Sequence, residues 1–358
     1  MAFTAEGGVE PKGERYDRSY LVKSDDKLYK RTEFNDFIYS SNNLDVGSIG
    51  LNKYGTAVIS DVYEIFRVKP NSSPTFMSEL IQRPHNIAEI LKYRQGCLYG
   101  QYRIYAEDFL NVSVLVPTKT EQEKVSQFFD ALDHRIEHQA GLIKALKKYK
   151  RGVMSVLLSS KDNPYYSSET WEEVSLCDVA SGFEYGMNAA ATIYDGSHRY
   201  IRITDIDDSS HLYIQDELVS PEGQVEEKYR VRENDILFAR TGASVGKSYC
   251  YQRSDGNLYF AGFLIRIHIN SDVDCSYVFQ NTLTEAYRRW VMLESARSGQ
   301  PGINAEQYKQ YRFLLPPIET QKKISFLASN LDTLISKGES LLSQLEQTKA
   351  ALLQQLFI

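Results

Sequence analysis

Residues 116–158 read VPTKTEQEKVSQFFDALDHRIEHQAGLIKALKKYKRGVMSVLL, and this pattern returns at residues 315–357 as LPPIETQKKISFLASNLDTLISKGESLLSQLEQTKAALLQQLF. Pro117 corresponds to Pro316, and the two residues are 199 positions apart. The same separation holds for four further pairs: Gln122 and Gln321, Asp133 and Asp332, Leu146 and Leu345, and Lys150 and Lys349. One register therefore runs through the whole segment.

The repeat continues upstream of this segment. Matches 199 residues apart occur at three more places: Gly100-Gln101 with Gly299-Gln300, Ile104 with Ile303, and Asn35-Asp36 with Asn234-Asp235. The period is far longer than the roughly 20 to 50 residues of solenoid repeats. We therefore interpret the chain as a tandem duplication in which each copy is a whole domain followed by a long helix.

The composition is that of an ordinary globular protein. The chain has 358 residues, of which 42% are hydrophobic and 25% charged, and this length gives room for two domains. No apolar run approaches the roughly 18 residues of a membrane span. The N-terminal MAFTAEGGVEPKGERYDR lacks the apolar core of a secretory signal. We expect a cytoplasmic protein that does not bind a membrane.

The cysteines and histidines do not indicate a metal site. The cysteines are scattered and form no Cys-x-x-Cys pair, which argues against zinc and against a disulfide framework; they are Cys97, Cys177, Cys250 and Cys275. His134 and His138 are four residues apart, but no third ligand accompanies them. We expect neither a metal nor another cofactor. The formal charge of −6 gives no overall attraction to nucleic acid, so such binding must come from local clusters.

Residues 1–116 are expected to form a first domain of mixed α/β character, in the α+β class. Residue patterns predict three elements in it: strands at 29–39 and 56–68 and, despite Pro84, one helix at 76–94. Trp171, which opens the second domain, has no counterpart 199 residues earlier. We therefore expect the first domain to be N-terminally incomplete relative to the repeat, with fewer strands than the second.

The repeated segments predict two long helices, at 117–158 and 315–358. Thr118 and Glu121 have the spacing of a capping box at the first helix start, and about 40 residues at 1.5 Å each give a rod of roughly 60 Å. One apolar seam runs along each helix, so we expect the two to pair as an antiparallel coiled coil. The alternative is that each helix packs only on its own domain. The seam residues are Val125, Phe129, Leu132, Ile136, Ile143, Leu146, Ile324, Leu331, Ile335, Leu342, Leu345 and Leu352.

A polar linker at 159–170 leads to the second domain, which is expected at 171–314. The predicted elements of this domain are a strand near 199–203, a strand and glycine-bearing loop within 229–246, a strand at 259–269 and a helix near 278–294.

The loop from Arg240 to Lys247 is the best candidate for DNA contact. It follows a predicted strand, its glycines allow close backbone approach, and its two basic residues can meet phosphates or a guanine edge. The alternative is a strand-connecting turn with solvated charges. Its G-x-x-x-G-K spacing does not fit a phosphate-binding P-loop. The candidates in this domain are Arg202, Arg240, Thr241, Ser244, Lys247 and Gln300.

The register places Ser41-Asn42-Asn43 opposite Arg240-Thr241-Gly242. Asn and Ser can read adenine edges or bind phosphate, so the two domains are expected to recognise different sequences. Gln101 corresponds to Gln300, and these two residues either contact DNA or brace the loop before each helix. The candidates in the first domain are Ser41, Asn42, Asn43, Ser48, Asn52, Lys53 and Gln101.

The order of domain, long helix, domain and long helix resembles the specificity subunit of type I restriction-modification systems. The similarity lies in the helix starts PTKTEQEK and PPIETQKKI, the helix end LEQTKAALLQQLF and four segments of the second domain: W-x-x-V-x-L at Trp171, YIRITDI at Tyr200, NDILFARTGASVGK at Asn234 and SGQPGINAEQY at Ser298. It covers nearly the whole chain. It departs at the N-terminus, where the expected first strands are absent.

The resemblance implies a non-catalytic subunit that reads double-stranded DNA at a bipartite site. In such a family each domain reads a few base pairs, and the helical rod fixes the spacing of the half-sites. Two methyltransferase subunits dock on the rod and domains, and restriction subunits with motor activity join for cleavage. Half-sites separated by helical turns of about 34 Å need a spacer of this scale.

Two other functions compete with this interpretation. DNPYY at Asp162 is similar to the Asn-Pro-Pro-Tyr signature of adenine methyltransferases, but one proline is missing and no Gly-rich loop for a methyl donor is found in the sequence. We therefore expect no active site. The remaining alternative is a coiled-coil structural adaptor, or an impaired specificity subunit, that binds protein partners without specific DNA readout.

Overall fold

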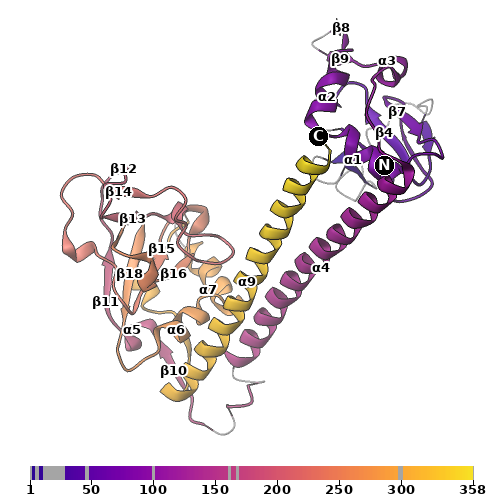
Figure 1. Ribbon diagram of the computed structural model, residues 1–358. Helices are drawn as coiled ribbons and strands as arrows, with labels where there is room; N and C mark the ends of the chain where they lie inside the picture. Colours follow the sequence, from indigo (N-terminus) through magenta and orange to yellow (C-terminus); the bar gives the residue numbers. More distant parts are fainter. Residues whose placement is uncertain are drawn as a thin grey trace. The chain divides into compact units, whose positions relative to one another are not determined.

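The computed structural model describes residues 2–4, 8–10, 29–44, 48–98, 101–159, 163–166, 169–296 and 301–357. The chain mixes α and β structure and divides into two compact units, the first holding residues 1–140 and 341–358 and the second holding residues 141–340 (Figure 1). Each of the two long helices therefore gives one half to each unit. Within the described ranges, no helix combines the length and the apolar content that crossing a bilayer requires.

The second unit is built on a four-stranded antiparallel sheet. Its strand order is β11 (Ala180–Tyr185), β18 (Leu264–Ile269), β15 (Asp235–Ala239) and β16 (Ser248–Cys250). Every residue of β15 is buried. Ile236 and Phe238 enter one hydrophobic cluster while Leu237 enters another, because successive side chains of a strand point to opposite faces. The unbroken apolar run of β15 therefore reflects a sheet that is covered on both faces.

Shorter elements surround this sheet. Among them are α5 (Leu176–Val179), β12 (Ala191–Ile193) paired with β14 (Val219–Pro221), β13 (Arg199–Ile201) paired in parallel with β17 (Leu258–Phe260), α6 (Cys275–Asn281), α7 (Glu285–Ser295), α8 (Ala305–Tyr308), and 3-10 turns at 203–205, 227–229, 242–244 and 253–255. Strand β10 (Glu172–Ser175) pairs with β19 (Arg312–Leu315), which directly precedes the last helix.

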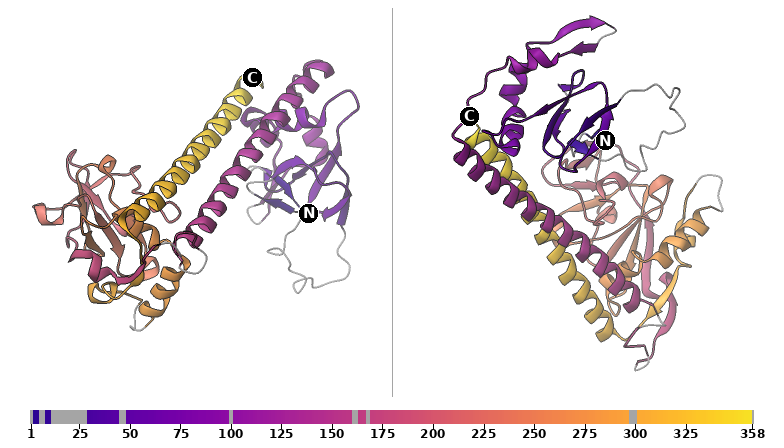
Figure 2. Two further views of the ribbon diagram at one scale, coloured as in Figure 1. Left: turned by 90° about the horizontal axis from the view of Figure 1, so that it is seen from below. Right: turned by 90° about the vertical axis from the view of Figure 1, so that its right-hand side faces the viewer.

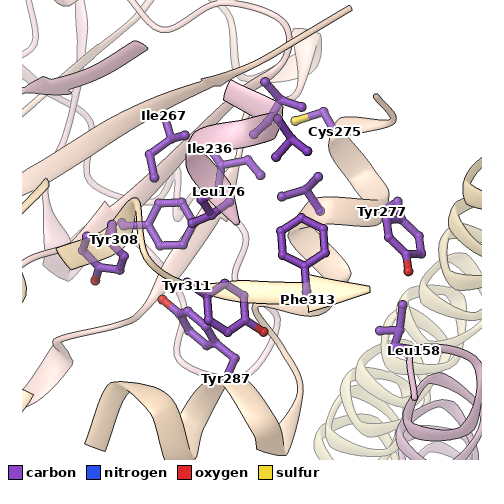
Figure 3. Close-up of a cluster of buried hydrophobic side chains, with 14 of the residues drawn as sticks. Leu158, Leu176, Ile236, Ile267, Cys275, Tyr277, Tyr287, Tyr308, Tyr311 and Phe313 are labelled. Carbon is purple, nitrogen blue, oxygen red and sulfur yellow. The ribbon is translucent and has the colours of Figure 1, made fainter. Parts of the chain in front are cut away.

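Buried tyrosines fill much of the core on one face of this sheet (Figure 3). The Tyr287 hydroxyl donates to the Gly246 carbonyl at 2.9 Å, and the Tyr308 hydroxyl donates to the Ala239 carbonyl at 2.7 Å. Burial raises the pKa of both tyrosines above its ordinary value. Each ring thus fills the core while its hydroxyl fixes the backbone at or after the end of β15, as buried tyrosines usually do when they find a partner.

The first unit repeats the centre of this design. Its main sheet has the order β5 (Ile49–Leu51), β4 (Asp36–Ser40) and β7 (Tyr63–Arg67), and β4 and β5 lie 199 residues before β15 and β16. The other elements are β1 (Ala2–Thr4) with β2 (Gly8–Glu10), β3 (Tyr29–Thr32) with β6 (Ala57–Ser60), β8 (Gln95–Leu98) with β9 (Gln101–Arg103), α1 (Pro74–Ile81), α2 (Pro84–Leu91) and α3 (Ala106–Leu110).

Five of the predicted elements are each broken into two. The strand expected at 56–68 is interrupted between β6 and β7, and the helix expected near 278–294 is interrupted between α6 and α7. The single helix expected at 76–94 is two helices, because Pro84 occupies the first turn of α2, where its missing N–H group is tolerated. The strand expected at 29–39 is broken at Asn35, whose φ of 65° lies in the left-handed region. The strand expected at 259–269 is broken by a turn through Gly262 that separates β17 from β18.

The long helices are α4 (Lys119–Leu157) and α9 (Ile318–Leu356), with 39 residues each, or about 58 Å at 1.5 Å per residue. They run side by side in opposite directions and form an antiparallel coiled coil (Figures 1 and 2). At the start of α4, both the amide and the hydroxyl of Thr118 donate to the Glu121 carboxylate, at 3.0 and 2.7 Å. All twelve predicted seam residues are buried or half-buried, with Phe129 and Ile324 among the least exposed.

Ion pairs between the two helices repeat with the register. The Lys150 ammonium lies 2.6 Å from the Asp332 carboxylate in the second unit, and the Lys349 ammonium lies 2.5 Å from the Asp133 carboxylate in the first. These lysines interrupt the apolar seam. Each offsets that interruption by donating to an acidic residue of the opposite helix, which favours one alignment of the two helices over others.

Each long helix is joined to its domain by the same buried amide. Gln122 donates to the Pro117 carbonyl at 2.9 Å and accepts from the Ser73 amide at 2.9 Å. Gln321 donates to the Pro316 carbonyl and accepts from the Asp274 amide, at 2.7 and 2.9 Å. Ser73 and Asp274 are the N-caps of α1 and α6, so the matched glutamines link the start of each long helix to a domain helix.

Candidate nucleic-acid interface

Backbone hydrogen bonds fix the shape of the loop from Arg240 to Lys247. The Gly246 amide donates to the Ala239 carbonyl at 2.9 Å, and the Lys247 amide donates to the Ser244 carbonyl at 3.0 Å. The Gly242 amide donates to the Pro301 carbonyl at 3.2 Å. With the two tyrosine hydroxyls beneath it, the loop is anchored at both of its ends.

Glycine is required at one position of this loop. Gly246 has a φ of 85°, and an added Cβ would lie 2.6 Å from the Val291 side chain beneath it. Both the left-handed conformation and the close contact exclude a side chain there. By contrast, Gly242 has a φ of 74° but open space around it. The sequence pattern thus marks a rigid, closely packed turn.

Arg240 presents its guanidinium group at the end of β15, directly before this turn. The group lies 4.9 Å from the centre of the Tyr185 ring, a cation–π arrangement that orients it. Tyr185 is the last residue of β11, and its hydroxyl accepts from the Ala305 amide at 3.2 Å. Among the described residues, no carboxylate forms an ion pair with Arg240.

Two of the other predicted basic residues are engaged inside the unit. Lys247 pairs with Asp208 and donates to the Ile206 carbonyl at 2.9 Å, and its side chain is only 11% exposed. Arg202 donates twice to Asp205, at 2.8 and 2.7 Å. Both side chains brace neighbouring loops, and their contact with DNA remains a prediction.

The remaining candidates of the second unit differ in position. Thr241 forms an isolated antiparallel bridge with Gly302 and is half-buried, as is Ser244 in the following 3-10 turn. Both hydroxyls lie on the same loop as Arg240. Gln300 lies outside the described residues.

The first unit carries the same loop geometry with different side chains. The Ile104 amide donates to the Ser41 carbonyl at 3.0 Å, and in the second unit the Ile303 amide donates to the Arg240 carbonyl at 2.9 Å. The Ser41 side chain is buried and donates to the Val62 carbonyl at 3.1 Å. Its hydroxyl is therefore engaged internally, and its assignment as a DNA contact remains a prediction.

Exposure separates the other candidates of the first unit. Asn43 and Lys53 are exposed, while Asn42 and Ser48 are half-buried. Asn52 is wholly buried, because its amide donates to the Gly55 carbonyl at 2.7 Å and its oxygen accepts from the Tyr54 amide at 2.9 Å. It stabilises a turn, and its contact with DNA remains a prediction. Gln101 lies in β9, and its side chain falls outside the described part of the structure.

A polar pocket in the second unit has a structural explanation. Its walls include Asp235, Arg266 and His268, and the buried Asp235 carboxylate accepts from His268 Nδ1 at 2.7 Å. Burial raises the pKa of this carboxyl group despite the histidine. The first unit has a related pair, Asp36 and Arg67, which corresponds by register to Asp235 and Arg266; Asp36 accepts from Arg67 at 3.3 Å, and Asp235 lies 3.8 Å from Arg266. A feature repeated in both units indicates a brace of the sheet.

The sequence patterns missed Tyr185 and the turn that contains Phe263. Both residues lie at the same end of the sheet as Arg240, since Tyr185 pairs opposite Ile265 and Ala239 pairs opposite Leu264. Gly262 inside the apolar run 259–269 was the available signal, because a glycine within a strand pattern often marks a break or a close backbone contact. Nothing in the sequence indicated the contact between Tyr185 and Arg240. Across the described residues, no cluster of His, Cys, Asp and Glu has the arrangement of a metal site.

Two sheet-based units that share an antiparallel helix pair, each with a polar loop at one sheet end, define a class of duplicated two-domain proteins. The family profile described as "Type I restriction modification DNA specificity domain" matches residues 168–347. The match covers half of the chain, and the chain belongs to this family.

Curated relatives agree with this assignment. The chain is 19% identical over 302 residues to the type I restriction enzyme StySPI specificity subunit of Salmonella potsdam, covering 80% of this chain and 65% of that protein. It is 26% identical over 200 residues to the putative type I restriction enzyme MjaX specificity subunit of Methanocaldococcus jannaschii, covering 53% and 46%. The matches thus span less than two thirds of the length of these relatives.

Solved structures share the fold. The S subunit of a type I restriction-modification system from M. genitalium aligns with a TM-score of 0.60 at 15% identity, over 92% of this chain and 84% of that chain. A chain from a structural study of the assembly and conformational transition of the type I R-M system aligns with a TM-score of 0.58 at 14% identity, over 94% and 84%. At this level of identity the likeness concerns the fold alone.

Proposed function

We propose that the chain is a non-catalytic subunit that reads a bipartite sequence in double-stranded DNA and docks methyltransferase and restriction subunits. One observation carries the DNA-reading role. The same backbone contact, from Ile104 to Ser41 and from Ile303 to Arg240, holds a loop at the same end of each sheet. The side chains on the two loops differ. A repeated scaffold with exchanged polar groups suits two half-sites of different sequence.

In the second unit, Arg240 is the residue that we propose makes the main contact with DNA. An arginine held in a fixed orientation can donate two hydrogen bonds to the O6 and N7 atoms of guanine, or bind a phosphate. Thr241 and Ser244 lie on the same loop. In the first unit the exposed Asn43 and Lys53, with the half-buried Asn42 and Ser48, supply amide, ammonium and hydroxyl groups. For the remaining candidates, Gln101 and Gln300, both interpretations stay open: each residue contacts DNA or braces the loop before its helix.

The long helices are the proposed spacer between the half-sites. Each of them is continuous over 39 residues, about 58 Å. Half-sites separated by one or more helical turns of about 34 Å need a stiff connection on this scale. The paired ion contacts between α4 and α9 support a fixed alignment of the two helices and hence a fixed spacing.

A second apolar stripe on the long helices supports protein docking. On α4, the exposed Phe128, Leu142, Tyr149 and Val156 are separated by multiples of seven residues. On α9, the exposed Leu327, Leu334 and Leu341 show the same spacing. A further helix packed in a bundle would cover such a stripe. On a surface that faces only water, a contiguous apolar stripe is unfavourable. Phe128 and Leu142 correspond by register to Leu327 and Leu341. Two equivalent stripes fit two methyltransferase subunits, and restriction subunits would join that complex.

The DNA-reading role is tested by selection from a randomised double-stranded DNA library with the full chain. The expected result is a split motif whose binding weakens steeply with salt, as contacts to phosphates require. Arg240→Ala should relax the sequence preference in one half of the motif by about 1 to 3 kcal/mol and leave the other half unchanged. Arg312→Ala, at an exposed arginine on β19, is the matched control. Equal retention of all duplexes at physiological salt would refute the proposal.

The docking role is tested separately. A type I methyltransferase subunit from the same genome is co-expressed with the full chain, and the complex is isolated through a tag on one partner. Leu142→Glu combined with Leu341→Glu should abolish co-purification, because a charge in each stripe opposes apolar packing. Arg151→Glu, at an exposed polar position of α4, is the control. Co-purification that survives the double variant would exclude the stripes as the docking surface.

A structural adaptor is the second candidate function, and one observation favours it. Leu115, directly before α4, is 94% exposed, and its neighbour Val116 is also exposed. Apolar side chains in this state suit a protein contact better than a DNA contact. An adaptor would co-purify with protein partners and select no DNA sequence, so the two experiments above distinguish the candidates.

A further inference from the structure

Phe263 stands at the tip of the turn between β17 and β18, with 63% of its surface exposed. Its neighbours on both sides are buried, with Ala261 at 7% and Leu264 at 0%. Full burial of a phenylalanine stabilises a protein by roughly 1.5 to 3 kcal/mol, and the fold of this unit forgoes most of that gain here. The ring is therefore held out of the core by the backbone around it.

The turn beneath Phe263 is rigid. The Leu264 amide donates to the Ala261 carbonyl at 2.9 Å, which closes the turn, and the Gly262 amide donates to the Met187 carbonyl at 2.8 Å. An added Cβ on Gly186 would lie 2.1 Å from the Ala261 carbonyl oxygen, so the two backbones are in direct contact. The ring can rotate about its own bonds, but the position of its Cα atom is fixed.

The turn is also tied to the candidate DNA-contacting loop. The Arg240 amide donates to the Phe263 carbonyl at 3.1 Å, and the Arg240 guanidinium lies over the Tyr185 ring at 4.9 Å. The ends of β11 and β15, together with the β17–β18 turn, therefore bring an exposed apolar ring and an oriented cation to one end of the sheet. This pairing combines a group that stacks on bases with a group that binds phosphates or base edges.

We propose that Phe263 is a wedge that inserts between two neighbouring base pairs of the half-site read by the second unit, with Arg240 binding a phosphate or a minor-groove base edge beside it. The inference rests on the DNA-reading function proposed above and deepens it by naming the kind of sequence that is read. Apolar wedges enter the stack from the minor groove and kink the duplex. Pyrimidine–purine steps are the most easily unstacked. The half-site of the second unit should therefore contain a TA, CA or TG step at the point of insertion.

The first unit carries a different side chain at this position. The position equivalent to Phe263 is Glu64, whose carboxylate pairs with Lys30 at 2.9 Å. An acidic side chain held in an ion pair cannot insert into stacked bases. The wedge therefore predicts an asymmetric distortion, in which one half of the selected motif is unstacked and the other half is read without unstacking.

The test uses the full chain and the duplex obtained by selection from the randomised library. 2-Aminopurine is placed at the pyrimidine–purine step of each half-site in turn, because its fluorescence rises when stacking is lost. The expected result is a rise in only one half-site, which disappears in Phe263→Ala and persists in Phe263→Leu, since leucine also serves as a wedge. Affinity for the duplex should fall about 5- to 150-fold in Phe263→Ala, the range expected for the loss of base–aromatic stacking.

Phe326→Ala is the matched control, because Phe326 is also an exposed phenylalanine, at 70%, but belongs to the helix α9 instead of the β17–β18 turn. Thermal unfolding of each variant shows whether the fold is retained, as expected for a change at an exposed ring. Unchanged fluorescence and affinity in Phe263→Ala, on a duplex that is selected normally, would overturn the wedge and leave the DNA-reading function standing. Failure of the full chain to select any duplex would overturn both.

Discussion

The segments that directly precede the two long helices differ in structure between the two units. In the second unit, β19 pairs with β10 along four residues, and Leu314 within it is half-buried. In the first unit, the equivalent residues 113–116 form no strand with any described residue, and Leu115, the counterpart of Leu314, is 94% exposed. The main sheet of the second unit also has one strand more, since β11 has no counterpart among the described strands of the first unit.

The comparison separates what the repeat preserves from what it does not. The three central strands, the glutamine link to the long helix and the loop contact before each helix occur in both units. The outer strands and the large tyrosine core occur in the second unit. Placement of the candidate loop therefore depends on the shared centre, while resistance to unfolding is expected to depend on the added outer elements.

The largest effect is expected at the close contact that fixes the end of β11. Gly186→Ala places a Cβ 2.1 Å from the Ala261 carbonyl oxygen and should lower the unfolding free energy of the second unit by more than about 3 kcal/mol. Both tryptophans, Trp171 and Trp290, lie in that unit, so tryptophan fluorescence in urea reports its unfolding. Gly182→Ala on the same strand is the control, because its nearest neighbour would be 4.0 Å away. Equal stability of the two variants would contradict the contact.

A second test compares equivalent seam residues. Ile324 is 1% exposed and belongs to the main core of the second unit, whereas its counterpart Val125 is half-buried. Ile324→Ala should cost about 3 kcal/mol and Val125→Ala about 1 kcal/mol. Urea unfolding is followed by tryptophan fluorescence for the first variant and by circular dichroism for the second. Similar losses would show that both helices pack equally tightly on their units.

A third test addresses the strand before each helix. Leu314→Ser should destabilise the second unit by about 1.5 kcal/mol, because it removes a packed side chain from β19. Leu115→Ser should change the stability of the first unit by less than about 0.5 kcal/mol, as expected for an exposed position. Thermal unfolding by circular dichroism measures both. A loss at Leu115 as large as that at Leu314 would mean that the segment is covered in solution, and the contrast between the units would fall.

The smallest effect is expected from a titrating group of the second unit. Burial holds the pKa of His211 below its ordinary value of 6.5, and its Nδ1 atom lies 2.8 Å from the Ser248 carbonyl. The folded state then binds fewer protons than the unfolded state, so this part of the stability is present above pH 6.5 and is lost as the pH falls below it. His211→Asn, which tolerates the φ of 59° at this position, should flatten that decline in urea unfolding. An unchanged slope would exclude His211 as its source.

Local sequence patterns were enough to predict much of the fold. The seam and the Thr118–Glu121 spacing predicted the long helices to within a few residues, because helix periodicity and capping are local properties. Turns inside apolar runs were missed at Asn35 and Gly262, where one residue with a special conformation or a close contact overrides strand propensity. The internal hydrogen-bond and ion-pair partners of Lys247 and Asn52 could not be predicted from the sequence. Their partners, Asp208 and Gly55, are brought to them by loop folding, which no sequence spacing encodes.

The paired ion contacts between α4 and α9 have an evolutionary consequence. Lys150 with Asp332 and Lys349 with Asp133 are one contact made twice, since the two lysines and the two aspartates are equivalent in the repeat. A helix that carries both halves of a contact is complementary to a second copy of itself, as in an isologous interface. A single copy of the domain and helix would therefore carry both halves of this contact, and duplication with fusion would join two such copies into one chain whose halves can diverge.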